Sequence, residues 1–221
     1  MKYFPRNTIA RILRSRGKQA FLKQLDATPI ILDVGCGNNS PKRTKEVLPQ
    51  AYYVGLDIGD YNNSTETLSF ADEYVLCEPN VFASEITKLG SRFDAVISSH
   101  NIEHCDDREA TLIAMAQSLK PSGSIFMSFP CEASVSFPKR SGTLNYYDDA
   151  THKFEPPSSI RVRQLLESEG VKIVYLNERY RPFILMLIGF FMEPLSMLKK
   201  RALIGTWALY GFETIIWGRK N

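Results

Sequence analysis

The sequence predicts an α/β fold of the doubly wound type, in which helices cover both faces of a mostly parallel sheet. Short apolar runs alternate with segments of helical periodicity along most of the chain, as parallel strands joined by helices do. The first run, residues 30–34 (IILDV), closes on the glycine turn Gly35-Cys36-Gly37, as expected of a strand that is buried on both faces.

Capping residues mark the first two helices of this fold. Ser40, followed by a proline, is a good N-cap for a short helix at residues 41–48. Asp106 or Asp107 can cap a helix that runs to residue 119, because its apolar residues recur at helical spacing.

The other strands are predicted from short apolar runs bounded by turn residues. Residues 121–123 (PSG) turn the chain between the second of these helices and the fifth strand. After the first run, we expect strands at residues 52–57, 74–77, 93–99, 124–129, 171–176 and 213–218.

Two long segments depart from this alternation. Residues 130–157 lose periodicity and gain Pro, Gly, Asp and aromatic residues, so we expect a functional loop there, followed by a helix at residues 158–169. Residues 178–212 form a very apolar insert that interrupts an antiparallel pair of the last two strands. Three interpretations of this insert stay open: a lid or helical pair that closes over a bound substrate, a homodimer surface, or a membrane-interface element.

The charge is unevenly distributed along the chain. With 27 Lys and Arg against 24 Asp and Glu, the formal net charge is +3, which argues against a nucleic-acid-coating protein. Residues 1–25 hold basic but no acidic side chains, so we expect a basic N-terminal helical arm at residues 1–27 before a single domain at residues 28–221. The arm has the composition of an interfacial helix, but also of a solvated helix that packs one apolar stripe.

Compartment and metal chemistry can also be predicted. Basic residues interrupt the N-terminal segment before a signal-peptide core forms, and no uncharged stretch approaches the ~20 residues that cross a bilayer, so we expect a cytoplasmic protein. The four cysteines have no CxxC pair and fit reduced thiols. Their spacing matches no metal-ligand pattern, and we expect no metal site.

The glycine turn and one acidic residue predict a nucleoside site. Gly35 and Gly37 allow a ligand to approach the backbone closely. Asp57, at the end of the second strand, can accept both ribose hydroxyls of a nucleoside. A dinucleotide fingerprint requires a small third residue where Ser40 stands and does not require Asp33, so these residues favour a sulfonium donor.

On these residues the sequence resembles the class I S-adenosylmethionine-dependent methyltransferases, specifically the group often called type 11. The first motif of that group appears as ILDVGCGNN, and VGLD, FDAVISSHNIEH and LKPSGSIFMSFP follow in the expected order. The resemblance covers roughly residues 28–131 and implies a Rossmann-like, seven-stranded methyltransferase fold that binds S-adenosylmethionine. It also implies cofactor contacts at Asp33, Gly35, Cys36, Gly37, Asp57, Ile58, Glu78 and Ser99.

Candidate catalytic residues follow the fourth and fifth strands. The segment around Asp149 and His152 resembles a D-D-x-T-H loop of group members found among glycan-building enzymes, and an Asp beside a His can raise its basicity. We expect His152 to be the general base and Asp149 its partner or a substrate contact. His104, in the E-H dipeptide, is a second candidate base, although a structural hydrogen-bonded role is the plainer interpretation.

These features predict a methyltransferase that O-methylates a sugar or glycan in polysaccharide or glycolipid biosynthesis. Two alternatives remain: a methyltransferase acting on a quinone or another small lipid-like molecule, and a non-catalytic methyltransferase-like subunit. The expected partners are a small-molecule or glycan acceptor and no nucleic acid. Peripheral association with a membrane and a homodimer are further hypotheses.

Overall fold

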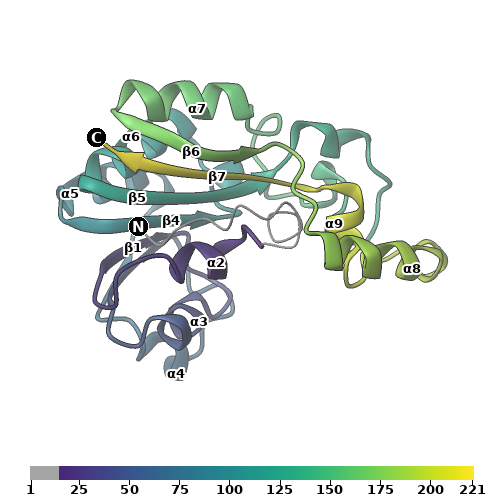
Figure 1. The fold of residues 1–221 in the computed structure, drawn as a ribbon, viewed down its shortest axis with the longest axis horizontal. Coiled ribbons are helices and arrows are strands. Elements are labelled where there is room, and N and C mark those ends of the chain that lie inside the picture. The colour runs from purple at the N-terminus through teal and green to yellow at the C-terminus, as the bar shows by residue number, and fades with distance from the viewer. Residues whose placement is uncertain (1–14) are drawn as a thin grey trace, which may run out of the picture.

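The computed structural model describes residues 15–221, so Lys2, Arg6, Arg11 and Arg14 of the predicted arm lie outside the described residues. Strands and helices alternate along the chain (Figure 1). In order, the helices and strands are α2 (Lys18–Leu22), β1 (Ile30–Val34), α3 (Ser40–Val47), β2 (Tyr52–Asp57), α4 (Thr65–Leu68), β3 (Glu73–Leu76), α5 (Phe82–Lys88), β4 (Phe93–Ser99), α6 (Arg108–Ser118), β5 (Leu119–Pro130), α7 (Ser159–Ser168), β6 (Val171–Asn177), α8 (Phe183–Lys199), α9 (Thr206–Tyr210) and β7 (Glu213–Lys220).

The strands of the described residues form one 7-stranded sheet with the order β3-β2-β1-β4-β5-β7-β6. The first five strands are parallel, and β7 runs antiparallel to both β5 and β6. The predicted doubly wound, mostly parallel sheet is therefore confirmed, as is the antiparallel pairing of the last two strands. The strand order reverses between β1 and β4. The connections that leave these two strands lead in opposite directions, which leaves a crevice at their carboxyl ends.

Helices cover both faces of the sheet (Figure 1). Successive side chains of β1 point to opposite faces. Leu32 packs in the cluster that includes side chains of α5, α6 and α7, whereas Ile31 packs with Phe21 of α2 and Trp217 of β7. This two-sided burial explains why the first strand is almost continuously apolar.

The strand bounds agree closely with the sequence-based prediction, with one difference at β5. Strands predicted at residues 30–34, 52–57 and 93–99 have those bounds in the structure. β5 begins at Leu119, so the predicted turn at residues 121–123 lies inside the strand. Ser122 adopts a left-handed φ of 64° there, and the pairing with β4 shifts register, which accommodates the extra residues as an irregularity of the strand.

The helix after the glycine turn begins one residue earlier than predicted. Asn39 occupies the N-cap position with a left-handed φ of 60° and no side-chain cap, so the prediction that Ser40 is the N-cap is wrong. The Ser40 hydroxyl instead donates to the Asp33 carboxylate. For α6, the structure selects Asp107, whose carboxylate accepts from the backbone N–H of Ala110.

The described part of the predicted arm packs against the sheet. Phe21 and Leu22 of α2 are buried, and the Phe21 ring lies 5.6 Å from the Trp217 ring, centroid to centroid. The indole N–H of Trp217 donates to the carbonyl of Arg16 over 3.0 Å. Residues 15–22 therefore contribute to the core that the sequence analysis assigned to residues 28–221.

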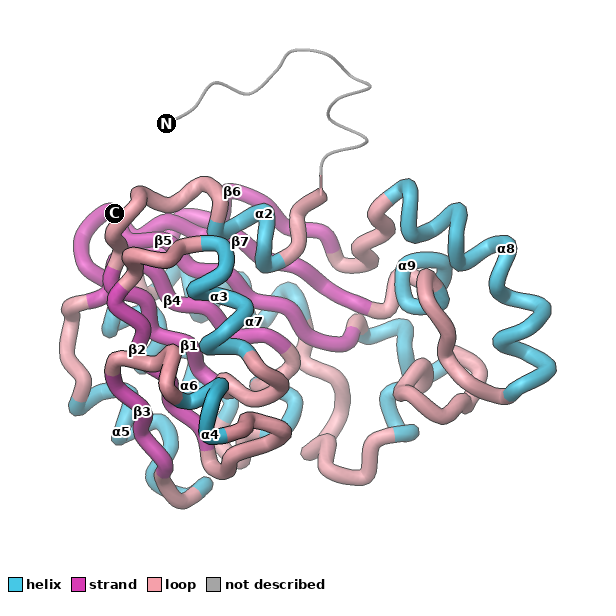
Figure 2. The backbone as a smooth tube through the Cα atoms, turned by 90° about the horizontal axis from the view of Figure 1, so that it is seen from below, coloured by secondary structure: helices cyan, strands magenta, loops and turns pink. Residues whose placement is uncertain are grey.

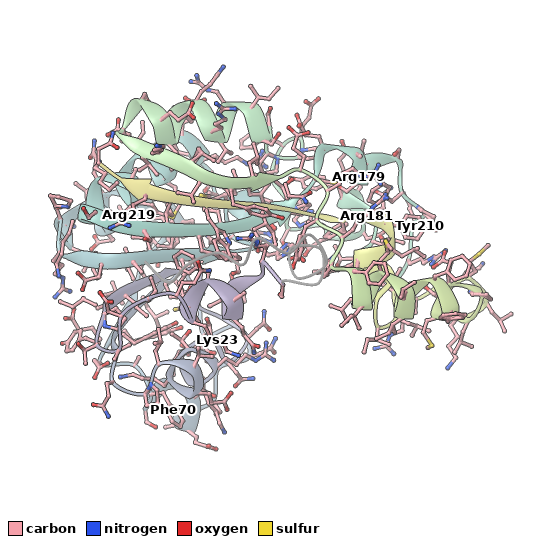
Figure 3. The ribbon with its side chains drawn as sticks, in the orientation of Figure 1. Lys23, Phe70, Arg179, Arg181, Tyr210 and Arg219 are labelled. Atoms are coloured by element: carbon pink, nitrogen blue, oxygen red, sulfur yellow. The ribbon has the colours of Figure 1, made fainter. Side chains whose placement is uncertain are left out.

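The insert between β6 and β7 projects beyond the end of the sheet (Figures 1 and 2). It contains α8 and α9. The backbone of α8 approaches the start of α9 so closely at Gly189 that a Cβ there would lie 2.1 Å from the Gly205 carbonyl oxygen, so only glycine fits. At its base, Arg179 and Arg181 both donate to the carbonyl of Tyr210 (Figure 3). No helix within residues 15–221 has the length and apolar character required to cross a membrane.

Candidate active site

The glycine turn after β1 is closely enclosed. Gly35 has a left-handed φ of 76°, and a Cβ there would lie 2.5 Å from the Asn101 side chain. A Cβ on Gly37 would lie 2.8 Å from that of Tyr61. Cys36 is fully buried, and burial raises the pKa of its thiol. Because this side chain faces inward, the predicted cofactor contact of Cys36 can involve only its backbone.

Asp33 lies at the carboxyl end of β1 and is only 1% exposed. Its Oδ2 atom accepts from Lys18 Nζ over 2.9 Å, from the Tyr53 hydroxyl over 2.7 Å, and from the Ser40 hydroxyl. Its Oδ1 atom has no hydrogen-bond partner among the described residues. A buried carboxylate oxygen without a donor is costly, and a ligand ammonium group would satisfy it.

Asp57 ends β2 and is also buried. Its Oδ1 atom accepts from the backbone N–H of Ile58 over 2.8 Å. Burial is the main influence on the carboxyl group and raises its pKa to about 6, although backbone N–H groups of Ile58, Gly37 and Gly59 oppose this increase. The Asp57 carboxylate thus lies beside the glycine turn, as predicted for a ribose contact.

A pocket of about 500 Å³ opens between α5 and α6; Ile58, the residue after Asp57, lines it, whereas Asp57 and the turn glycines do not. Ile58, Pro79, Asn101 and His104 are among the side chains that line it. Glu78 is exposed and is not part of this lining, whereas its neighbour Pro79 is. The predicted cofactor residue Ser99 ends β4, and its buried hydroxyl has no partner within residues 15–221.

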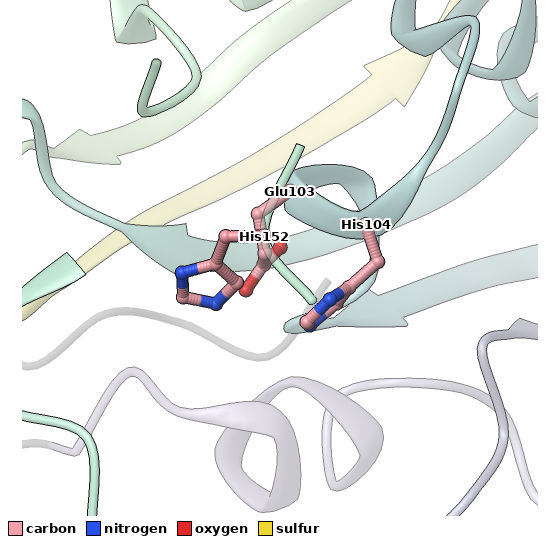
Figure 4. A group of neighbouring side chains, drawn as sticks. All are labelled: Glu103, His104 and His152. Atoms are coloured by element: carbon pink, nitrogen blue, oxygen red, sulfur yellow. The ribbon is translucent and has the colours of Figure 1, made fainter. Parts of the chain in front are cut away.

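The predicted catalytic residues lie close together, and one of them, His104, lines this pocket. The rings of His104 and His152 lie 4.8 Å apart, centroid to centroid. His152 stacks on Tyr146 at 4.3 Å, and its Nε2 atom lies 3.9 Å from Asp149 Oδ2. Glu103 adds a fully buried carboxylate, and the three side chains Glu103, His104 and His152 point toward one another (Figure 4).

Hydrogen bonds fix the tautomers of both histidines. His152 Nδ1 lies 2.6 Å from the carbonyl oxygen of Tyr146, which can only accept, so Nδ1 carries the proton. The Thr151 hydroxyl donates to Asp149 and therefore accepts from His104 Nδ1, 3.0 Å away. Each ring thus has its Nδ1 held by the protein, which leaves Nε2 as the nitrogen available to a substrate or ligand. Burial lowers the pKa of His152, which keeps this ring neutral.

His100 differs from the other two histidines. Its Nδ1 atom lies 3.1 Å from Glu103 Oε1, and its Nε2 atom lies 2.8 Å from Glu213 Oε1. Burial lowers its pKa, but the hydrogen bonds and charges of the two carboxylates outweigh this effect and raise the pKa to about 10. His100 is therefore a cation that joins the loop after β4 to β7.

The structure adds functional side chains that sequence reasoning missed. Lys18 and Tyr53 both donate to Asp33, although neither belongs to a recognisable motif. Glu103 is one of several candidate bases that the sequence offers after the fourth strand, but its burial was not predicted: its Oε2 atom is buried without a partner in the described part of the chain. The E-H dipeptide was the available signal for Glu103, whereas a lysine fifteen residues before Asp33 carries none.

Comparisons with known proteins agree with this geometry. The profile of a family described as a methyltransferase domain matches residues 2–176. The human mitochondrial ubiquinone biosynthesis O-methyltransferase is 29% identical over 169 residues, which cover 69% of this chain and 44% of that protein. The chain therefore spans less than half the length of this curated relative.

Solved structures with the same fold are more distant in sequence. An S-adenosylmethionine-dependent methyltransferase from Mesorhizobium loti has a TM-score of 0.58 at 16% identity, covering 90% of this chain and 96% of that chain. The phosphoethanolamine N-methyltransferase 2 of Haemonchus contortus, solved with S-adenosyl-L-methionine, has a TM-score of 0.60 at 14% identity, covering 91% and 51%. The fold, the glycine turn with its two aspartates and the family match lead to one conclusion: the chain belongs to the S-adenosylmethionine-dependent methyltransferases of the class I, type 11-like group.

Proposed function

We propose that this protein transfers a methyl group from S-adenosylmethionine to a hydroxyl oxygen of an acceptor carried on a lipid. The observation that carries the proposal is the His152 imidazole, whose Nδ1 is held by the Tyr146 carbonyl and whose ring lies 4.8 Å from that of His104, a residue that lines the pocket. A neutral imidazole of fixed tautomer can accept the proton that an attacking hydroxyl must lose. The exposed apolar surface of α8 supports the lipid component.

The described residues fit the methyl donor. Asp33 Oδ1 and the Ser99 hydroxyl are buried polar atoms without partners, and they suit the ammonium and carboxylate groups of the methionine portion. Asp57 suits the two ribose hydroxyls, and the pocket beside Ile58 suits the adenine. When bound, S-adenosylmethionine supplies an activated methyl group on a sulfonium. The glycines at positions 35 and 37 leave room for the ligand at the backbone.

On the acceptor side, His152 receives the proton. The acceptor oxygen forms a bond to the methyl carbon while the carbon–sulfur bond breaks, and the electron pair of that bond remains on sulfur. The hydroxyl proton passes to His152 Nε2, which Tyr146 leaves free by accepting from Nδ1. Asp149, 3.9 Å from Nε2, stabilises the resulting imidazolium. His104, held by Thr151, completes the acceptor site.

The outer face of α8 supports a lipid-carried acceptor. Gly189 and Ser196 are buried on the inner face of this helix. The outer face presents large apolar side chains that are 39% to 82% exposed: Phe183, Ile184, Leu187, Phe190, Phe191 and Leu198. A surface helix normally has the opposite polarity, whereas a helix that lies in a membrane interface exposes its apolar side. The exposed basic residues 199–201 follow at its end and suit anionic head groups.

A buried ion pair connects α8 with the loop that carries the histidine. The guanidinium of Arg140 donates to both carboxylate oxygens of Glu193 on α8, over 2.7 and 2.8 Å, and to the Ser196 hydroxyl. In the same loop, Asp148 accepts from the backbone N–H of Arg140 and of Asn145. The membrane-facing helix and the acceptor loop therefore form one unit, which would bring a lipid head group near His152.

Two classes of acceptor combine a hydroxyl group with a lipid carrier. A lipid-linked sugar, the class favoured by the D-D-x-T-H resemblance, has hydroxyls but no apolar head group. A quinol has a phenolic hydroxyl on an apolar ring, and the similarity to ubiquinone biosynthesis O-methyltransferase favours it. The non-catalytic alternative is less favoured, because Asp33, both turn glycines and Asp57 are all present.

The test is a methyl-transfer screen in mixed anionic vesicles with methyl-labelled S-adenosylmethionine. The panel contains polyprenyl-linked sugars, soluble sugar nucleotides and long-chain and short-chain quinols. We expect label in a lipid-carried acceptor and much less in its soluble counterpart. Label confined to soluble sugar nucleotides would contradict the lipid component, and label on nitrogen or carbon would contradict the O-methyl assignment.

A further inference from the structure

Three electron-pair donors converge at the acceptor site. A ring nitrogen of His104, a ring nitrogen of His152 and a carboxylate oxygen of Glu103 all lie within 4.8 Å of one another (Figure 4). They come from distant parts of the chain, namely the turn after β4 and the loop before α7. The fold thus brings two adjacent residues of the first segment, Glu103 and His104, together with His152 of the second.

The protein holds one nitrogen of each histidine and leaves the other available to a ligand. Both histidines use Nδ1 to donate to the protein, His152 to the Tyr146 carbonyl and His104 to the Thr151 hydroxyl. Histidines that bind metals show this arrangement, in which a carbonyl or a polar side chain holds the second nitrogen and directs the lone pair of the first at the ion.

Glu103 supplies the negative charge. Its side chain is 0% exposed. Its Oε1 atom lies within hydrogen-bond distance of His100 Nδ1, and its Oε2 atom has no hydrogen-bond partner within residues 15–221. A fully buried carboxylate oxygen without a hydrogen-bond partner is unfavourable unless a positive charge lies beside it. His100 hydrogen-bonds only to the other oxygen.

We infer that Glu103, His104 and His152 bind one divalent transition-metal cation. Two imidazole nitrogens and one carboxylate oxygen favour Zn²⁺, Co²⁺ or Mn²⁺ over Mg²⁺, which prefers oxygen ligands alone. Bonds of about 2.0–2.2 Å to such an ion place tetrahedral ligand atoms about 3.3–3.6 Å apart. The ligand atoms here lie within 4.8 Å of one another, so binding would draw them together by up to about 1 Å. His104 lines the open pocket, which provides an entry path.

The cation would take over the removal of the acceptor proton, which the proposed function assigns to His152, and this part of the inference rests on that methyl transfer. Three protein ligands leave open coordination positions, so the acceptor hydroxyl can bind the ion and lose its proton to solvent at neutral pH. His152 then acts as a ligand, and the ionised oxygen attacks the methyl group. The prediction of no metal site was based on the spacing of the cysteines. The cysteines take no part in this site, since all its ligands are His and Glu.

The experiment measures metal binding directly, apart from catalysis. The full chain is stripped with a chelator and titrated by calorimetry with ZnCl₂, CoCl₂, MnCl₂ and MgCl₂, with the bound metal quantified by elemental analysis. We expect one Zn²⁺ or Co²⁺ per chain. His152→Ala and Glu103→Gln should each weaken binding at least tenfold, whereas the matched control Glu155→Gln, an exposed acid of the same loop, should not change it.

A second readout separates misfolding from lost ligation. Each variant is also titrated with S-adenosylmethionine, whose predicted contacts lie at the glycine turn and should be unaffected. Binding of Co²⁺ should add absorption bands typical of mixed nitrogen and oxygen ligands, and His152→Ala should remove them. Absence of stoichiometric metal on the folded wild-type chain, or equal binding by His152→Ala, would overturn the inference. Metal binding without methyl transfer would leave the site standing and reject the proposed function alone.

Discussion

Lys18 Nζ lies 2.9 Å from Asp33 Oδ2, so the basic segment before the domain donates a charge to the first motif of the cofactor site. Asp33 is 1% and Lys18 23% exposed, which makes this pair the most buried contact of the N-terminal segment with the site. The basic residues of the arm are therefore not all available to an external anionic partner. One of them holds the carboxylate that is predicted to face the methionine portion of the cofactor.

Replacing Lys18 with Met should destabilise the protein and weaken cofactor binding. The change leaves the buried Asp33 carboxylate without its ionic partner, at a cost of about 1–3 kcal/mol for a partly exposed pair. Urea denaturation and calorimetric titration with S-adenosylmethionine measure the two effects. Lys23→Met, an exposed lysine just past the same helix, is the control and should be neutral (Figure 3). Equal behaviour of the two variants would show that the contact is unimportant.

Cofactor affinity should fall below a pH of about 6. Ribose hydroxyls need an ionised acceptor, and burial raises the pKa of Asp57 to about 6. Affinity should therefore decrease up to about tenfold per pH unit below that value. Calorimetric titrations between pH 5 and 8 test this expectation, and Asp60→Asn, which alters an exposed acid, should leave the profile unchanged. A flat profile for the wild type would refute the assigned role.

The same pKa has a stability consequence of opposite sign. Because the folded-state pKa of Asp57 lies above its ordinary value of 3.8, ionisation favours unfolding, and stability is lost as the pH rises from about 4 to about 6. Asp57→Asn removes this loss, about 3 kcal/mol from the size of the shift. Urea denaturation should find the variant more stable than wild type at pH 7.5, but not at pH 4. Greater wild-type stability at pH 7.5 would contradict the account.

Thr151→Val should lower methyl transfer without affecting cofactor affinity. The variant removes the hydroxyl that fixes the His104 tautomer, and loss of such an orienting contact typically costs about 10–100-fold. Initial rates and S-adenosylmethionine titrations measure the two properties. Thr65→Val, a change at an exposed threonine of α4, serves as the control. An unaltered rate would remove Thr151 from the account.

Polar substitutions on the outer face of α8 should abolish vesicle binding. Phe191 and Leu198 are 77% and 82% exposed, and each apolar side chain of this size contributes about 1.5–3 kcal/mol when buried in a membrane interface. The double variant Phe191→Ser, Leu198→Ser should therefore remain in the supernatant when sedimented with anionic vesicles. Ile160→Ser, on the exposed face of α7, should still bind. Wild-type protein that stays soluble with vesicles would reject the membrane interpretation.

The sequence predicted the sheet well because buried parallel strands have a strong signature. Residues 30–34, 52–57 and 93–99 are continuous apolar runs, and no competing pattern obscures their ends. The short helices α4 and α5 were missed, since Thr65–Leu68 is too short for periodicity. Ser40 was misassigned because capping preferences are local, whereas its hydroxyl is engaged by Asp33 on the neighbouring strand.

The site was only partly accessible from sequence for the same reason. Asp33, Asp57 and the turn glycines lie at the carboxyl ends of β1 and β2, and the structure places them side by side. The pairing of His104 with His152 joins segments 48 residues apart through Thr151, so only the fold reveals it. Glu78 was assigned by its position after β3, but its exposed side chain is absent from the pocket lining, which includes the following Pro79 and Asn80 instead.

The most direct test of the central claim is the transfer of label from methyl-labelled S-adenosylmethionine to a lipid-carried hydroxyl in anionic vesicles. We expect wild-type protein to produce a labelled methyl ether and equimolar S-adenosylhomocysteine, and we expect His152→Ala to bind the donor normally but to transfer at least about a hundredfold more slowly. Failure of the wild-type protein to bind S-adenosylmethionine, or full activity of His152→Ala, would contradict the account.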